Sequence, residues 1–113
     1  MSPLLLFLAP LVTAQGVNIG KVYDRCTGQA AVAELWSGTP ETIADHALAK
    51  CRYLEPQLKE GLDRMWRTDR SGNVEPATDI SRLMTAQSWE RLLAAKRSRL
   101  ISDIGRLREE LRK

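Results

Sequence analysis

Apolar residues recur at helical spacing along most of the chain, and the clearest run lies between residues 43 and 65. Its members are three or four residues apart, which places them on one face of a helix. They are Ile43, Ala47, Cys51, Leu54, Leu58, Leu62 and Met65. Proline lacks a backbone N–H and clashes with the preceding turn, so Pro56 predicts a kink over residues 52–55. The alternative is a complete break, with Pro56 starting a second segment.

A shorter amphipathic helix is predicted before this one, between Val22 and Trp36. Its candidate inward residues are Val22, Cys26, Ala30, Ala33 and Trp36. Gly38 then offers a C-terminal cap, and Thr39 and Pro40 suit the N-cap and the first helical position. The two helices should therefore form an antiparallel hairpin over residues 20–68.

A turn-rich stretch over residues 69–78 predicts a loop, and Thr78 is a suitable N-cap for a third helix over residues 79–112. Toward its end the apolar spacing becomes 4, 3, 4, as in a short coiled-coil seam. The residues of this seam are Leu100, Ile104, Leu107 and Leu111. No alternating strand pattern accompanies the helices. The predicted fold class is all-α, a helical hairpin plus a long C-terminal helix.

The two cysteines are placed symmetrically about the predicted turn. Cys26 lies twelve residues before Gly38, and Cys51 lies twelve residues after Thr39. In an antiparallel hairpin both reach the same height, and both belong to the apolar stripe of their helix. A disulfide needs its two Cα atoms within about 7 Å, which this arrangement provides. We therefore predict a Cys26–Cys51 disulfide; two reduced core thiols in a cytosolic protein are the alternative.

The first fourteen residues predict an export signal. An apolar block runs from Leu4 to Val12, and no charged side chain precedes Lys21. The block is shorter than the roughly 18 to 20 residues of a membrane-spanning helix, and small residues follow it. We expect cleavage of residues 1–14, a single domain over 15–113, and a periplasmic or secreted location. The alternatives are an apolar first turn docked in the core and a misassigned start codon.

The segment between Tyr23 and Leu58 resembles a group of small exported helical proteins of proteobacteria that have no assigned function. The resemblance rests on Cys26, the run Ile43-Ala44-Asp45, Ala47 and Cys51. It implies a helical fold and an exported location, and it implies no activity.

The candidate chemistry is sparse, and we predict no catalytic residue, no metal site, no cofactor and no small-molecule ligand. His46 is the only histidine. Cys51 follows it by five residues and therefore points to a different side of the helix, so the two side chains cannot bind one metal ion. The loop that contains Asp69 and Glu75 does not have glycine and glutamate at the positions where a calcium-binding loop requires them. A net charge of +3 with 14 interspersed acids does not predict nucleic-acid binding.

The third helix carries the candidate interaction surface. From Trp89 to Lys113 it has eight basic residues against four acids, together with the apolar seam. The predicted surface comprises Trp89, Leu100, Ile104, Leu107, Leu111, Arg97 and Arg106. The leading hypothesis is a non-enzymatic envelope binding module that pairs with a second copy or another envelope protein. The alternatives are a peripheral membrane-surface binder and, more weakly, a small secreted enzyme or enzyme inhibitor.

Overall fold

The computed structural model describes residues 18–113, and this part of the chain is all-α as predicted. Its elements are α1 (Ile19–Ala33), α2 (Pro40–Lys50), the 3-10 turn η2 (Arg52–Leu54), α3 (Glu55–Arg67) and α4 (Asp79–Arg112). The long C-terminal helix has the predicted bounds. The predicted signal peptide, residues 1–14, lies outside the described residues.

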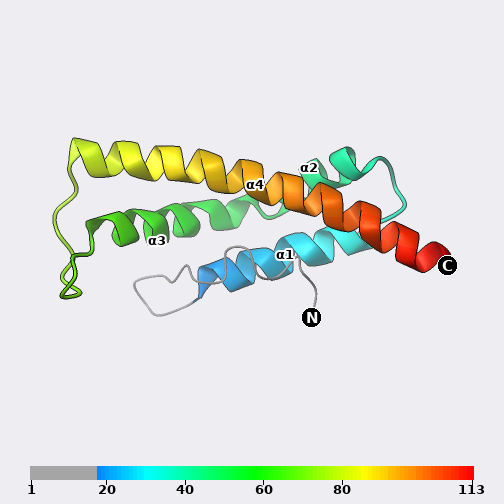
Figure 1. Ribbon diagram of the computed structural model, residues 1–113, viewed down its shortest axis with the longest axis horizontal. Coiled ribbons are helices and arrows are strands. Elements are labelled where there is room, and N and C mark those ends of the chain that lie inside the picture. The colour runs from blue at the N-terminus through cyan, green and yellow to red at the C-terminus, as the bar shows by residue number, and fades with distance from the viewer. Residues whose placement is uncertain (1–17) are drawn as a thin grey trace.

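Helix α4 runs along the whole molecule, which measures 52 × 24 × 21 Å, and the other helices pack against it in two groups. Helices α1 and α2 pack together, and α2 covers the C-terminal half of α4 (Figure 1). Helix α3 packs along the N-terminal half of α4, and α1 begins beside the middle of α3 (Figure 1). The outer part of α3 and the first turns of α4 therefore extend past α1 as a two-helix arm. We call α3, the loop 68–78 and residues 79–91 of α4 the arm.

The predicted long second helix is interrupted at Pro56, so the expected kink is wrong and the alternative of a break is correct. Helix α2 ends at Lys50, and Pro56 occupies the first turn of α3 after the 3-10 turn. Proline is tolerated there because its missing N–H would have no helical partner. The apolar stripe still holds across the break, since every predicted member except Met65 is buried.

The buried face of α1 is one residue, or about 100°, away from the predicted one. Ile19, Tyr23, Thr27 and Ala31 are buried, whereas Val22 and Trp36 are exposed. The prediction counted apolar positions only, and this face contains the buried polar residues Asp24 and Thr27. Thr27 Oγ1 donates to the Tyr23 carbonyl at 3.0 Å, so its burial leaves no unsatisfied hydroxyl.

Side chains cap the starts of α2 and α4 as the sequence predicted. Thr39 Oγ1 accepts the Thr42 amide at 3.1 Å, and Thr78 Oγ1 accepts the Ser81 amide at 3.0 Å. Ser81 Oγ in turn accepts the Thr78 amide at 2.8 Å, which completes a capping box. None of the described helices has a stretch long and apolar enough to span a bilayer.

Candidate interaction surface

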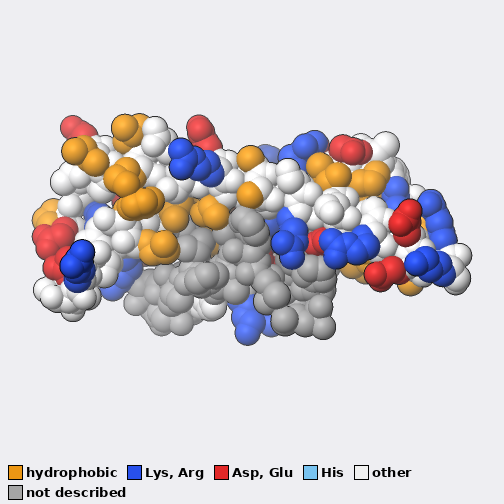
Figure 2. All heavy atoms as spheres, viewed as in Figure 1, with side chains coloured by type: hydrophobic (Ala, Val, Ile, Leu, Met, Phe, Trp, Pro, Cys, Tyr) orange, Lys and Arg blue, Asp and Glu red, His pale blue; other side chains and the backbone are white. Residues whose placement is uncertain are grey.

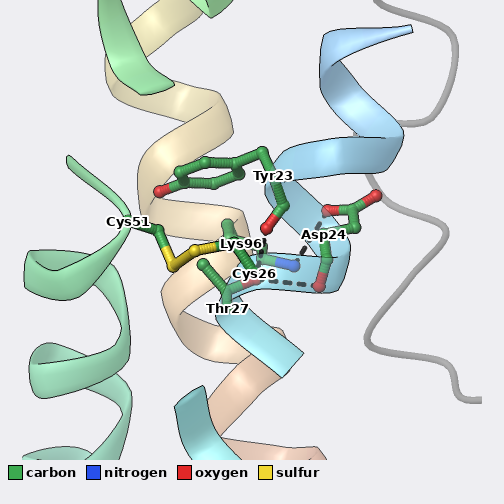
Figure 3. Close-up of a disulfide and its surroundings, with 6 residues drawn as sticks. All are labelled: Tyr23, Asp24, Cys26, Thr27, Cys51 and Lys96. Carbon is green, nitrogen blue, oxygen red and sulfur yellow. Dashed lines mark hydrogen bonds and ion pairs between the residues drawn. A yellow bond between two sulfur atoms is a disulfide. The ribbon is translucent and has the colours of Figure 1, made fainter. Parts of the chain in front are cut away.

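The disulfide joins the middle of α1 to the C-cap of α2, as predicted. Cys26 and Cys51 have Cα atoms 6.0 Å apart, and Cys51 is fully buried (Figure 3). The bond closes a loop that contains the turn between the two helices. It therefore fixes the hairpin against which α4 packs.

Beside the disulfide, a buried ion pair joins α1 to the middle of α4. Lys96 Nζ lies 2.9 Å from Asp24 Oδ1, and neither side chain exposes any surface (Figure 3). Burial lowers the pKa of Lys96, and the hydrogen bond and charge of Asp24 oppose that shift. A buried charge pair of this kind requires a defined geometry, so it sets the position of α4 on α1.

Sequence analysis counted Lys96 only among the eight basic residues of the third helix and did not predict its burial. A signal was present: Leu92, Lys96 and Leu100 are four residues apart, so Lys96 lies on the stripe that faces the hairpin. On the neighbouring helix, Asp24 falls next to Tyr23 on the buried face of α1. A lysine on one apolar stripe and an aspartate on another would have predicted this pair.

The structure does not bring the predicted interaction residues together on one open surface. Trp89, Leu100 and Ile104 are buried in the core, and Leu107 packs against it. Leu111 is exposed near the end of α4. The two arginines have partners within the chain: Arg97 Nε donates to Asp45 at 2.7 Å, and Arg106 donates to Asp103 at 2.8 Å. The chain's own hairpin thus covers most of the seam.

Five of the ten large exposed apolar side chains among the described residues lie on the arm. Their exposed fractions are 71% for Ile80, 58% for Leu83 and Met65, 44% for Trp66 and 41% for Val74. Figure 2 shows hydrophobic side chains grouped over this end of the molecule. We call these five residues the arm patch. Sequence reasoning placed Met65 in an apolar stripe and missed that it is exposed on the arm.

The arm patch has a simple structural cause. Leu58, Leu62 and Met65 belong to one stripe of α3, and the first two are buried in the core. The stripe then runs past the start of α1 (Figure 1), and Met65 at its outer end is exposed, with no described helix covering it. On α4, Ile80 precedes the buried Trp89 by nine residues, which is half a turn around the helix. Ile80 therefore faces away from the side that Trp89 buries.

The arm also contains a groove that is lined by both apolar and charged side chains. A groove of about 470 Å³ lies between α3 and α4, and none of the arm patch residues lines it. Trp89 and Pro56 supply apolar walls, while Lys59, Asp63, Arg82 and Glu90 are charged. Lys59 Nζ lies 5.2 Å from the centre of the Trp89 ring. Trp66 is not part of this groove, and its Nε1 donates to Ser88 Oγ at 3.0 Å.

Charge is distributed unevenly along the molecule. Residues 55–91, which include the arm, carry six basic and seven acidic side chains. Residues 92–113 carry seven basic and three acidic side chains, so the positive excess lies at the C-terminal end of α4. There Arg108 and Arg112 lie 5.6 and 5.2 Å from the centre of the Trp36 ring. Arg108 also donates to the carbonyls of Leu35 and Gly38.

Asp69 and His46, which sequence analysis considered for metal binding, have structural partners. Asp69 Oδ1 accepts the amides of Ser71 and Asn73, both at 2.9 Å, and these hydrogen bonds lower the pKa of Asp69. His46 Nδ1 lies 3.4 Å from Glu34, which also pairs with Lys50 at 3.0 Å. Within residues 18–113, no three His, Cys, Asp or Glu side chains are grouped so that they could hold a metal ion.

Comparison with known proteins gives no match: no protein-family model, no curated protein and no solved structure matches the chain.

Proposed function

We propose that this protein is a non-enzymatic binding module of the cell envelope, and that its α3–α4 arm binds a protein partner. The arm patch is the observation that carries the proposal. There two packed helices extend beyond α1 (Figure 1), and five large apolar side chains of the described residues are exposed.

The size of the arm patch supports binding. Its exposed fractions correspond to about 500 Å² of accessible surface, if a fully exposed large side chain is taken as roughly 150 to 250 Å². Apolar patches of a few hundred Å² on a small protein often mark interaction sites. At about 25 cal/mol per Å², covering such an area provides a substantial driving force for association.

The shape of the arm indicates the kind of partner. Helix α1 contacts α3, and Leu58 and Leu62 of α3 are buried in the same core as Ile19 and Tyr23 of α1. Over the outer half of α3, none of the described helices occupies this position. An amphipathic helix placed there would continue the packing of α1 and cover Met65 and Trp66. We therefore still propose that the partner binds through helix–helix contacts with the predicted third helix, which is α4, and we now place these contacts at the N-terminal end of α4.

The membrane-surface alternative is less well supported by this arrangement. Binding to an anionic bilayer requires an apolar face and basic side chains at the same membrane-facing surface. Here the arm patch is at one end of α4, and the basic excess is at the other. Arg97, Arg106 and Arg108 also have partners within the chain.

The envelope location rests on the predicted signal peptide, and the Cys26–Cys51 disulfide supports it, since such bonds persist in oxidising compartments. Mass spectrometry of the native protein tests it. We expect an amino terminus at Gln15, and an intact Met1 or Ser2 on the abundant form would refute processing.

Site-specific photo-crosslinking in the native cells tests the binding function. A photo-reactive amino acid at Ile80 should give one defined protein adduct, while the same group at Leu111 should give none. Leu111 is a matched control because it is also an exposed apolar residue of α4, with 61% of its surface exposed. Equal labelling at both positions would refute the arm as the binding surface. Binding to anionic vesicles that depends on Arg106 and Arg108, without a protein adduct at Ile80, would favour the membrane alternative.

A further inference from the structure

We infer that thiol–disulfide exchange between this protein and external thiols or disulfides takes place at Cys26, and that Cys51 acts only as its internal partner. The two cysteines form one bond (Figure 3), but the fold gives them different surroundings. Cys51 exposes no surface, whereas Cys26 is partly exposed. The inference is independent of the proposed function, because neither cysteine belongs to the arm.

The position of Cys26 on α1 explains its exposure. Residues four apart lie on the same side of a helix, and Val22 and Ala30 flank Cys26 at this spacing. Val22 is exposed and Ala30 is partly exposed, so this side of α1 follows the edge of the core. The next residue, Thr27, lies about 100° around the helix and is fully buried. Cys26 is therefore placed between the core and the solvent.

Cys51 has the opposite position. It is the C-cap of α2, and it continues the buried stripe of this helix, with Ala47 before it and Leu54 after it. Both of these residues belong to the hydrophobic core. A reagent in solution cannot reach the Cys51 sulfur while this packing is intact. The apolar surroundings also disfavour a thiolate at Cys51.

The chemistry of exchange makes this difference in burial decisive. An attacking thiolate must reach one of the two bonded sulfurs, and the other sulfur is the leaving group on the far side of the attacked one. Attack on Cys26 Sγ can come from the solvent side, because the leaving sulfur of Cys51 lies on the buried side of the bond. Attack on Cys51 Sγ would have to come through the core.

The same order applies when the bond forms. The Cys26 thiolate attacks an external disulfide, R–S–S–R, so that a Cys26–S–R bond forms and one R–S⁻ leaves. The Cys51 thiolate then attacks Cys26 Sγ, the internal disulfide forms, and the second R–S⁻ leaves. The two protons that the cysteine thiols lose are taken up by the two leaving thiolates. Two protein thiols are thus oxidised, and one external disulfide is reduced.

Single-cysteine variants test this assignment, with oxidised glutathione as the external disulfide. Cys51→Ala leaves Cys26 as the one thiol, and Cys26→Ala leaves Cys51, so each variant is the matched control of the other. Both are purified as their cells process them, and mass spectrometry follows the growth of the glutathione adduct. We expect the folded proteins to form the adduct at least about tenfold faster at Cys26 than at Cys51. In concentrated urea the two rates should converge, because the fold no longer shields Cys51.

Circular dichroism establishes whether both variants are folded. If either is not, the unchanged disulfide-bonded protein is treated with reduced glutathione, the exchange is stopped with acid, and peptide mapping identifies the cysteine that carries glutathione. We expect it on Cys26. Equal rates in the folded variants or a faster reaction at Cys51 would refute the inference. Mapped peptides in which glutathione is not on Cys26 would refute it as well.

Discussion

Lys96 Nζ lies 2.9 Å from Asp24 Oδ1, although the two residues are 72 positions apart, and both side chains are completely buried. The Tyr23 ring is part of the same environment, with its centre 6.0 Å from the ammonium (Figure 3). An isolated buried charge is costly, so the two ions depend on each other. The pair therefore links correct packing of α4 to correct packing of α1.

Removing one partner of this pair should destabilise the protein strongly. In Lys96→Met the side chain keeps a similar length and fills the core, but Asp24 loses its buried counter-charge. We expect the free energy of unfolding to fall by about 3 to 5 kcal/mol. Urea unfolding followed by circular dichroism measures the change.

The double variant Asp24→Leu with Lys96→Met separates charge from packing. If the cost of the single variant comes from the lost ion pair, the double variant should lose less stability than the two single changes added together. Strictly additive losses would show that the two side chains act independently, in contradiction to the structure.

The disulfide should contribute more to the free energy of unfolding than a surface contact does. Cys26 and Cys51 are 25 residues apart, and closing a loop of that length should stabilise the folded state by about 3 to 4 kcal/mol in the chain-entropy model. We expect the double change Cys26→Ala with Cys51→Ala to lower the thermal unfolding midpoint by many degrees. Reduction of the unchanged protein should lower it similarly, whereas a reductant should leave the double variant unaffected. A loss of less than a degree would show that the bond is not structural.

The features of the fold that could be predicted are those that repeat along the chain. The bounds of α4, the caps Thr39 and Thr78, and the Cys26–Cys51 bond all follow from spacing and from turn residues. Pro56 also gave a signal, but periodicity could not decide between a kink and a break, because a 3-10 turn of three residues left the apolar stripe intact.

The features that were missed depend on contacts between distant residues. The buried face of α1 contains Asp24, and Lys96 reaches it there from another helix, 72 positions along the chain. The same limit applies to the candidate surface. Met65 and Leu62 look alike in the sequence, and their different exposure is decided by where α1 begins relative to α3.

Acid should weaken the fold through carboxylates whose pKa values are lowered in the folded state. The hydrogen bond from Lys50 and that from His46 lower the pKa of Glu34, and the hydrogen bond from Arg97 lowers the pKa of Asp45. Such groups bind protons more readily in the unfolded chain than in the folded protein. Their contribution to the free energy of unfolding is therefore complete above the unfolded pKa of about 4, and it is lost as the pH falls through the lower pKa of the folded state. We expect stability to be constant near neutrality and to decline from roughly pH 5 downward.

Arg97→Gln provides the control for the acid prediction. Without the guanidinium, Asp45 loses the main cause of its lowered pKa, so the decline with acid should be shallower than in the unchanged protein. The measurement is thermal unfolding at a series of pH values. Equal slopes for the two proteins would show that the Asp45–Arg97 pair, although present at 2.7 Å, does not contribute to acid sensitivity.

The start of α4 should depend on Thr78, because the arm patch is presented by the first turns of this helix. The Thr78 side chain accepts the Ser81 amide, and Ser81 Oγ accepts the Thr78 amide, so two otherwise unpaired donors are satisfied together. Thr78→Ala removes the first of these bonds and should cost about 1 kcal/mol of stability, whereas Thr78→Ser keeps the hydroxyl and should cost much less. Hydrogen exchange distinguishes local from global effects: we expect faster exchange of the amides near Ser81 in Thr78→Ala, with the amides around Lys96 changed only through the overall loss of stability. Uniformly unchanged exchange at Ser81 would show that packing of the arm, and not the capping box, holds the first turn of α4 in place.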